Sequence, residues 1–260
     1  MTGSIYMAAN GALAYQKRLQ VLSNNLANAN TVGFKQDQSH FQTYYLSEFL
    51  KRDTPMTTDR GVSQAPSFWF RLNTYTDHTQ GPLKETGNRL DLAINGRGFF
   101  CVQTPQGIQY TRNGNFTLSA DGLLITPQGW PVLGQSGEIV IERQSAFTDP
   151  QGHDFLVDQS GNVSVDGNIV DKFRIVDFEN SDNLEKVGDS SFIPRSPNMV
   201  ESPATDFTLS QGVVELSNVN ALQMMTELIE VHRGFESYQK VIRSIDEVNS
   251  KIINEVGGPQ

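Results

Sequence analysis

Apolar side chains recur in alternating steps of three and four residues at both ends of this 260-residue chain. The series at the N-terminal end consists of Ile5, Ala8, Ala12, Tyr15, Leu19, Leu22, Leu26 and Ala29. The series at the C-terminal end, which is apolar except for one asparagine, consists of Ala221, Met224, Leu228, Val231, Phe235, Tyr238, Ile242, Ile245, Asn249 and Ile252. This spacing places an apolar seam along one side of a helix, as in coiled coils. We therefore predict a long amphipathic helix at each end of the chain.

The C-terminal helix has signals for its start and for its end. Asn220 precedes the seam and Gln223 follows three residues later, which is the spacing of a capping pair. The sequence “GGP” at residues 257–259 would end the helix. Because a glycine costs about 1 kcal/mol in a helix interior, we expect either a bend or a close helix contact at Gly234.

The middle of the chain consists of short alternating segments separated by the turn dipeptides Asn95-Gly96, Asn113-Gly114, Asp121-Gly122, Ser160-Gly161 and Asp166-Gly167. Such dipeptides supply the positive backbone angles of tight hairpins. The segment from Gln109 to Ile125 is therefore predicted to be a three-stranded meander, with Asn113-Gly114 and Asp121-Gly122 at its corners.

The sequence thus divides into five parts. Residues 1–40 form a helix and a turn, residues 81–191 form an all-β domain, and residues 213–260 form a coiled-coil helix. The stretches 41–80 and 192–212 are rich in Thr, Ser, Pro and Asp, which predicts two long linkers. The expected fold class is α+β, with the two long terminal helices forming a coiled-coil layer around the central all-β domain.

Composition and charge exclude several classes of function. A net charge of −9 without a cluster of lysine or arginine argues against nucleic acid as a partner. Because no run of about 18 apolar residues occurs, we expect no transmembrane segment. The start “MTGSIYMAAN” lacks the basic flank and the apolar stretch of a secretory signal, so we expect that export would not use a cleaved signal peptide.

Residues that could perform chemistry are present, but they form no recognisable pattern. The spacing of the histidines matches no metal-ligand pattern. They are His40, His78, His153 and His232. The single cysteine, Cys101, lies in the apolar run “GFFCV” and is expected to be a small buried hydrophobic residue. We therefore predict no catalytic residue, no metal and no cofactor.

Asparagines stand beside the N-terminal seam in the segment “LSNNLANANTVGFK”, which begins at Leu22. The amides of Asn24, Asn25 and Asn28 could donate and accept hydrogen bonds between helices. Amides beside a seam can determine register and partner choice. A merely polar helix face with a frayed end is the alternative.

The same segment has signals for the end of the helix. Asn30 tolerates the left-handed backbone of a helix cap. Gly33 then permits a sharp turn, after which Phe34 is expected to pack back.

One terminal helix is marginally stable when it stands alone. Ten buried seam positions contribute roughly 15 to 30 kcal/mol, whereas ordering roughly thirty residues costs about 1 to 2 kcal/mol each in backbone entropy. The two helices could pair within one chain, but the alanine-rich N-terminal seam buries little surface. Further burial requires helices from other copies or from other subunits.

Three stretches of the sequence resemble a known family. “LSNNLANANTVGFK” near the start and “SNVNALQMMTELIEVHRGFESYQKVI” near the end resemble the rod, hook and hook-associated axial proteins of the bacterial flagellum. The stretch from Gln80 to Gly134 is similar to the rod and hook branch of that family. The chain length and the segment “TQGPLKETGN” favour the proximal-rod type over the distal-rod type and over the much longer hook protein.

This resemblance implies a structural subunit of the flagellar basal body, not an enzyme. Its relatives are exported unfolded by the flagellar type III export apparatus and assemble beneath a rod cap into a helical tube. That tube crosses the periplasm and transmits torque. The implied partners are other copies of the chain and neighbouring flagellar rod proteins.

The expected assembly interface combines the two motifs of the resemblance with the two seams. The motif residues are Asn24, Asn25, Leu26, Ala27, Asn28, Thr31, Gly33, Phe34, Ser217, Asn218, Val219 and Asn220. The seam residues are Leu19, Leu22, Met224, Leu228, Val231, Phe235, Tyr238, Ile242, Ile245 and Ile252.

Two other functions stay open on the residues alone. The first is a secreted β-rich module that binds cell wall or another surface and whose terminal helices pair only with each other. The second is a peptidoglycan hydrolase, which would use two carboxylates at a defined separation, such as Glu85 with Asp91 or Glu138 with Glu142. A solvated acidic surface is the simpler interpretation of these pairs.

Overall fold

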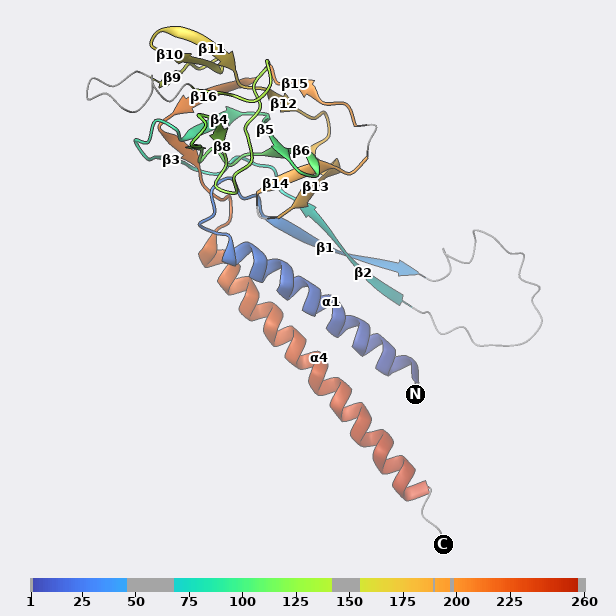
Figure 1. Ribbon diagram of the computed structural model, residues 1–260. Coiled ribbons are helices and arrows are strands. Elements are labelled where there is room, and N and C mark those ends of the chain that lie inside the picture. Colours follow the sequence, from blue (N-terminus) through green and yellow to red (C-terminus); the bar gives the residue numbers. More distant parts are fainter. Residues whose placement is uncertain (1, 46–67, 142–154, 189, 197–198, 257–260) are drawn as a thin grey trace, which may run out of the picture. The chain divides into compact units, whose positions relative to one another are not determined.

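The computed structural model describes residues 2–45, 68–141, 155–188, 190–196 and 199–256 (Figure 1). The chain divides into two compact units. The helical unit contains the described parts of residues 1–26, 37–75 and 220–260, and the β unit contains those of residues 27–36 and 76–219. None of the described helices is both long enough and apolar enough to cross a membrane.

The helical unit contains the two predicted helices and a pair of strands. Its elements are α1 (Thr2–Ala27), α4 (Ala221–Val256), β1 (Asp37–Tyr45) and β2 (Phe68–Thr76). The helices α1 and α4 run side by side (Figure 1), and β1 and β2 form a two-stranded sheet. The α+β class is therefore confirmed.

The β unit is built entirely from antiparallel pairs. Its largest sheet has six strands in the order β13-β14-β6-β5-β12-β15, and a second sheet has the order β11-β10-β9. Three two-stranded sheets pair β16 with β4, β17 with β3, and β7 with β8. The first strands are β3 (Leu83–Glu85), β4 (Leu92–Gly96), β5 (Phe99–Thr104), β6 (Gly107–Thr111), β7 (Thr117–Leu118), β8 (Leu124–Ile125), β9 (Phe155–Val157) and β10 (Asn162–Val165). The others are β11 (Asn168–Lys172), β12 (Ile175–Asp177), β13 (Leu184–Val187), β14 (Ser191–Pro194), β15 (Ser202–Pro203), β16 (Phe207–Gln211) and β17 (Val213–Glu215).

Strands occupy parts of both stretches that were predicted to be linkers. β1 and β2 lie on either side of residues 46–67, and β15 and β16 lie within residues 192–212. The linker prediction is wrong at these strands because their pairing is not local. β16 pairs along its whole length with β4, so that Leu209 faces Ile94, and such a distant partner leaves no turn signal in the sequence.

The predicted meander is only partly present. Asp121-Gly122 lies in the loop that joins the paired strands β7 and β8, and Gly122 has a φ of 81°. Asn113-Gly114, by contrast, joins β6 to β7, which belong to different sheets. A Cβ on Gly114 would lie 1.7 Å from the carbonyl oxygen of Leu92. This glycine is therefore required by a close backbone approach and not by a hairpin.

Strand β5 is buried on both faces and so joins two apolar clusters. Phe100 packs in one cluster with the rings of Phe116 and Phe173, whose centroids lie 5.2 and 5.8 Å away. The alternate residues Phe99 and Cys101 lie in the other cluster. A central strand between two cores reads as a continuous apolar run, which explains “GFFCV”. Cys101 is fully buried, as predicted.

Candidate functional site

The most buried seam residues of the two helices are covered by other residues of the same chain. Ala8, Ala12 and Leu22 of α1 are 4 to 8% exposed, and Met224 and Val231 of α4 are 8 and 4% exposed. The other predicted interface residues on this seam are half-buried, and they are Leu19, Leu26, Leu228, Phe235, Tyr238, Ile242 and Ile245. The side chain of Ile252 lies outside the described residues.

Two tyrosines and two glycines form a reciprocal contact between α1 and α4. The rings of Tyr15 and Tyr238 lie 5.4 Å apart at 49°. A Cβ on Gly234 would lie 2.2 Å from Tyr15 Cε1, and one on Gly11 would lie 2.5 Å from Tyr238 Cε1. Each tyrosine therefore occupies the space that a glycine leaves on the opposite helix. Of the two expectations for Gly234, the structure supports the close helix contact.

An ion pair between α1 and α4 extends this contact. Arg18 donates to the carboxylate of Glu227, and both side chains are a little more than one quarter exposed. Together with the two tyrosine contacts, this pair shows that α1 and α4 run antiparallel. Ion pairs with this exposure contribute about 1 kcal/mol or less, so packing at the glycines does more than charge to hold the two helices together.

Asn25 does not bridge the two helices, contrary to our expectation. Its side chain is 1% exposed; Nδ2 donates to Asp37 O at 2.7 Å, and Oδ1 accepts from Asp37 N at 2.9 Å. The amide thus binds the backbone at the start of β1 as a neighbouring strand would. The pattern beside the seam indicated a buried amide but could not identify this partner.

The turn after α1 begins with Asn28. Thr31 donates its hydroxyl to Asn28 Oδ1 at 3.0 Å and its backbone N–H to Asn28 O at 3.1 Å. Asn24, Ala27 and Asn30 are exposed.

The predicted left-handed cap at Asn30 is wrong. Among the described residues other than glycine, only Asp166 has a positive φ. The left-handed backbone falls at Gly33, with a φ of 69°.

Gly33 and Phe34 are built into the β unit. Gly33 donates its N–H to Glu215 O at 2.8 Å, and a Cβ on it would lie 2.3 Å from Asn113 N. Phe34 is fully buried, and Lys186 Nζ lies 4.1 Å from the centroid of its ring. The sharp turn and the return of Phe34 are therefore confirmed, and the surface that receives them is the β unit.

A buried cluster of three charges lies beside this turn and was not predicted. Lys35 Nζ lies 2.5 Å from Glu215 Oε1, and Arg112 Nη1 lies 3.4 Å from Glu215 Oε2. These three side chains are 1, 0 and 6% exposed. Burial lowers the pKa of Lys35 and of Arg112, and the charge of Glu215 opposes both shifts.

Backbone groups complete the surroundings of this charge cluster. Lys35 Nζ also donates to Thr79 O at 2.6 Å, and Glu215 Oε1 accepts from Gly81 N at 2.9 Å. Arg112 Nη2 donates to Gly96 O at 2.8 Å. One buried carboxylate therefore neutralises part of the charge of two cations, and it joins the segment after α1 to the segment before α4.

Asn218, from the predicted C-terminal motif, joins the same two segments. Its Oδ1 accepts from Gln36 N at 2.7 Å, and its Nδ2 donates to Asp77 O at 2.9 Å and to Thr79 O at 3.2 Å. The adjacent Ser217 is buried, and its hydroxyl accepts from Val219 N at 3.3 Å. Three chain segments of the β unit thus meet at one asparagine.

Asn220 caps α4, as its spacing to Gln223 predicted. Its Oδ1 accepts from Gln223 N at 3.2 Å, and its carbonyl oxygen accepts from Met224 N at 2.9 Å. The cap satisfies backbone donors that a helix start otherwise leaves free.

His78 lies close to the charge cluster, among aromatic rings. Its ring centroid is 5.1 Å from that of Phe192 and 5.8 Å from that of Phe99. Both ring nitrogens are buried, and neither has a hydrogen-bond partner among the described residues. Burial, assisted by the charge of Lys35, lowers the pKa of His78 to about 4. The imidazole is therefore neutral near pH 7.

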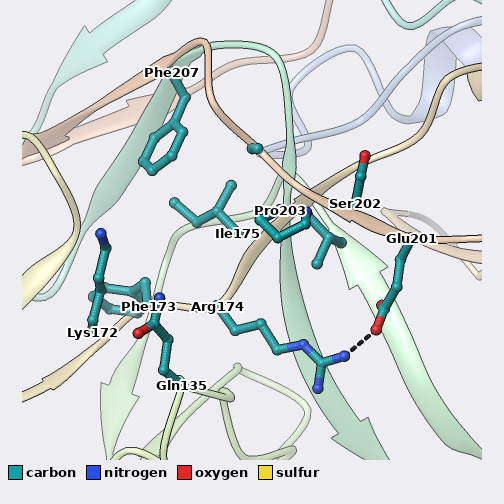
Figure 2. Close-up of a pocket in the computed structure, with 11 residues that line it drawn as sticks. Gln135, Lys172, Phe173, Arg174, Ile175, Glu201, Ser202, Pro203 and Phe207 are labelled. Carbon is teal, nitrogen blue, oxygen red and sulfur yellow. Dashed lines mark hydrogen bonds and ion pairs between the residues drawn. The ribbon is translucent and has the colours of Figure 1, made fainter.

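One hollow of the β unit could hold a small ligand (Figure 2). It has a volume of about 380 Å³ and lies between β12 and the segment that carries β15. Among the described residues that line it, Glu201 is the only carboxylate, and it pairs with Arg174 and accepts from Tyr110 Oη at 2.8 Å. A hydrolase would need a second carboxylate in the same hollow.

One of the carboxylates proposed for a hydrolase has a structural role. Asp91 accepts hydrogen bonds from the side chains of Thr86, Asn88 and Asn115. It therefore fixes a turn of the β unit. Glu142 lies outside the described residues. The described residues contain no group of three or more side chains suited to a metal ion.

Three segments of the chain match families of known proteins. Residues 5–35 match “Flagella basal body rod protein”, residues 93–165 match “Flagellar hook protein FlgE/F/G D1 domain”, and residues 210–255 match “Flagellar basal body rod FlgEFG protein C-terminal”. The first and third matches cover the two helices with their motifs, and the second covers much of the β unit.

Curated relatives align with nearly the whole chain. The flagellar basal-body rod protein FlgF of Caulobacter vibrioides is 33% identical over 258 residues, which cover 99% of this chain and 99% of the relative. The rod protein FlgG of Bacillus subtilis is 33% identical over 266 residues, which cover 98% and 99%. FlgF of Rhizobium meliloti is 32% identical over 259 residues, which cover 99% of each chain.

Proposed function

The chain belongs to the flagellar basal-body rod protein family, of the FlgF/FlgG type, and we propose that it occupies the proximal rod as the FlgF subunit. As a member of this family it is a structural subunit of the basal body and not an enzyme. The proximal position is supported by the chain length and by the segment “TQGPLKETGN”, which resembles the proximal-rod type.

We propose that the subunit polymerises through its terminal helices into a tube that crosses the periplasm and transmits torque. The observation that carries this proposal is the junction between the two motifs. The segment after α1 is bonded to the segment before α4 through Gly33, Lys35 and Asn218. A force on the segment after α1 or on the segment before α4 is therefore opposed by buried hydrogen bonds and ion pairs of the β unit.

The assembly interface remains the two motifs and the two seams, now with different roles. Four motif residues act from inside the β unit, where they fix the segment after α1 and the segment before α4. These residues are Gly33, Phe34, Ser217 and Asn218. The half-buried seam residues from Leu228 to Ile245 keep part of their surface open. Contact with further helices would bury that surface and complete a coiled-coil layer.

The proposed partners are other copies, neighbouring rod proteins, the rod cap and the flagellar type III export apparatus. The support for the cap and for the export apparatus is the family resemblance of both terminal motifs. We propose export without a cleaved signal on the same ground. Intact-mass measurement of the chain in purified basal bodies tests this point, because a cleaved signal would shorten the N-terminus.

Deletion and complementation test the function directly. Cells that lack the chain should be non-motile and should lack rods beyond the proximal segment, and the wild-type chain should restore both. Ile242→Asp should fail to restore motility, because it places a charge in an apolar contact, while the β unit stays folded. Normal motility after deletion would contradict the rod function and favour a surface-binding module.

A further inference from the structure

The junction between the two motifs depends on a third stretch of chain, residues 77–79, which we call the connecting segment. Thr79 O accepts from Lys35 Nζ at 2.6 Å and from Asn218 Nδ2 at 3.2 Å. Asp77 O accepts from the same amide of Asn218 at 2.9 Å. The connecting segment therefore binds both the segment after α1 and the segment before α4.

The middle residue of the connecting segment, His78, lies in surroundings that suit a neutral ring. Its imidazole packs against the rings of Phe99 and Phe192. Both ring nitrogens are buried, and neither has a hydrogen-bond partner among the described residues. A protonated imidazole has two N–H donors, and burial of a charge whose donors are unbonded is costly. The packing that holds a neutral His78 therefore disfavours a charged one.

The charges around His78 also disfavour a positive ring. The groups from other segments that act on it most strongly are Lys35, Asp182, Arg112 and Lys186. Three of these four are cations, and the carboxylate of Glu215 is already shared by two of them. Asp182 is exposed, so solvent screens its attraction for a buried charge. Protonation of His78 would thus add a positive charge to a group that has too few negative ones.

Two other titratable groups near the ring do not compensate this charge. The adjacent Asp77 binds Gln36 Nε2 and Thr79 N, each at 3.0 Å. Cys101 is carried by β5, as Phe99 is, and it stays neutral in acid because burial raises its pKa to about 12. The strand β14, which carries Phe192, has no charged residue.

We propose that protonation of His78 releases the connecting segment and opens the junction locally, while the rest of the β unit stays folded. In the open state the ring reaches water, and Lys35 and Asn218 lose the backbone acceptors that the segment supplied. The junction is the observation on which the proposed function rests, so this inference concerns the regulation of that same site. The opening itself is a property of a single chain.

The place of the connecting segment allows such a local opening. Thr79 is exposed, and Asp77 and His78 are only half-buried, so the segment can move outward without crossing the core. The next residue, Gln80, is held by β4, because its side chain donates to Ile94 O and accepts from Gly96 N. The opening should therefore end at Gln80. Local openings of this kind require less free energy than unfolding of a whole domain.

The direction and the size of the acid effect follow from the two environments of the ring. Burial lowers the pKa of His78 to about 4, whereas in water the pKa is 6.5. Between these values the open state binds a proton that the closed state does not. The population of the open state should therefore rise by up to about tenfold for each pH unit of acidification. Above pH 6.5 the ring is neutral in both states, and this dependence should vanish.

Hydrogen exchange of the full chain between pH 7 and pH 4 tests the opening, once each rate is corrected for the intrinsic effect of pH. Two backbone N–H groups report on the junction. They are Asp77 N, which donates to Gln36 O at 2.9 Å, and Gln36 N, which donates to Asn218 Oδ1 at 2.7 Å. Their protection should fall by up to about tenfold per pH unit. Leu124 N donates to Ile139 O in the core, and its protection should not change.

Two variants and one further measurement identify the group that takes up the proton. His78→Phe retains an aromatic ring but binds no proton, so protection at the junction should be equal at pH 7 and pH 4. His232→Phe is the matched control, because His232 lies exposed on α4, and it should show the acid effect of the wild type. NMR titration of the His78 ring in the wild-type chain does not depend on the folding of a variant. The ring should take up its proton together with the loss of protection at the junction.

Each possible result decides for or against the local opening. Unchanged protection at the junction down to pH 4 would overturn it, and a His78 ring that titrates there in place would indicate a cation–π contact with its aromatic neighbours. A parallel loss at Leu124 would show that the whole β unit unfolds. A His78→Phe chain with the acid effect of the wild type would exclude His78 as the sensor. None of these results bears on the rod function, which deletion and complementation test separately.

Discussion

The helical unit and the β unit are stabilised by different kinds of contact. The β unit buries whole aromatic rings and a cluster of three charges, in which Glu215 is fully buried. The helical unit has a partly exposed ion pair between its two helices, a contact between two tyrosines and two glycines, and large apolar residues on its surface. The β unit also exposes apolar side chains, such as Ile169 and Val200 at 71 and 82%, but it encloses two apolar clusters within one chain. The helical unit has a smaller buried seam and gains further burial from partners.

The largest effect is expected from Glu215→Gln. This change keeps the shape of the side chain but leaves Lys35 and Arg112 buried without the carboxylate that both of them contact. Removing one partner of a buried ion pair costs about 3 to 5 kcal/mol, and urea unfolding of the β unit should show this loss. Glu201→Gln is the matched control, because its pair with Arg174 is about one third exposed and should contribute about 1 kcal/mol or less. Equal losses would show that burial of charge does not distinguish the two sites.

A smaller effect is expected from acid, through His78. Its pKa is about 4 in the folded chain and 6.5 in the unfolded chain. Between these values the unfolded chain binds a proton that the folded chain does not, so stability should fall as pH falls from 6.5 to 4. The free energy of unfolding should decrease by up to about 3 kcal/mol over this range. His78→Phe should remove this part of the pH dependence, and parallel curves for the two chains would contradict the assignment.

The helical unit should respond to Gly234→Leu. A new side chain there would overlap Tyr15, and such overpacking costs about 1 to 3 kcal/mol. Hydrogen exchange in α1 and α4 should therefore become faster. If Gly234 marked only a bend, leucine would stabilise the helix by about 1 kcal/mol, and exchange would slow. Adding Tyr15→Ala should reverse the effect, because it vacates the space that leucine needs.

The smallest effect is expected from Asn220→Ala. This change removes the acceptor for Gln223 N at the start of α4, and loss of an N-cap costs about 1 kcal/mol. Faster hydrogen exchange should be confined to the first turn of α4, while the β unit stays unchanged. Asn220→Ser retains a capping oxygen and should exchange as the wild type does. A loss that spread along the whole helix would mean that the cap also determines the helix pairing.

Local signals predicted some elements and misidentified others for the same reason. Asn220 and the dipeptide Asp166-Gly167 act on neighbours within a few residues, and both occur as predicted: a helix cap, and the hairpin that joins β10 to β11. Asn113-Gly114 has the same local signal as a hairpin, but its glycine serves a contact with Leu92. A turn dipeptide indicates that a glycine is needed at that position. It does not indicate whether the glycine forms a hairpin or makes room for the backbone of a distant residue.

The motif after α1 shows the same limit at the candidate site. The sequence predicts a contact between helices for its asparagines and a sharp turn for Gly33, but it names no partner for either. In the structure Asn25 binds the backbone of Asp37, and Gly33 binds Glu215. Nothing in the sequence distinguishes Lys35, because a lone lysine at the end of a motif is ordinarily solvated.

The sequence by itself determined the two terminal helices, the seam along each of them, the cap at Asn220 and the family of the chain. These properties depend on residue type and on spacing within a few helical turns, and so they can be predicted from the sequence. Only the tertiary structure decided that Lys35 meets Glu215, 180 residues away, and that Tyr15 meets Gly234. Such pairs form because the folded chain excludes water from both partners at once, and no local pattern encodes a partner that folding brings from so far.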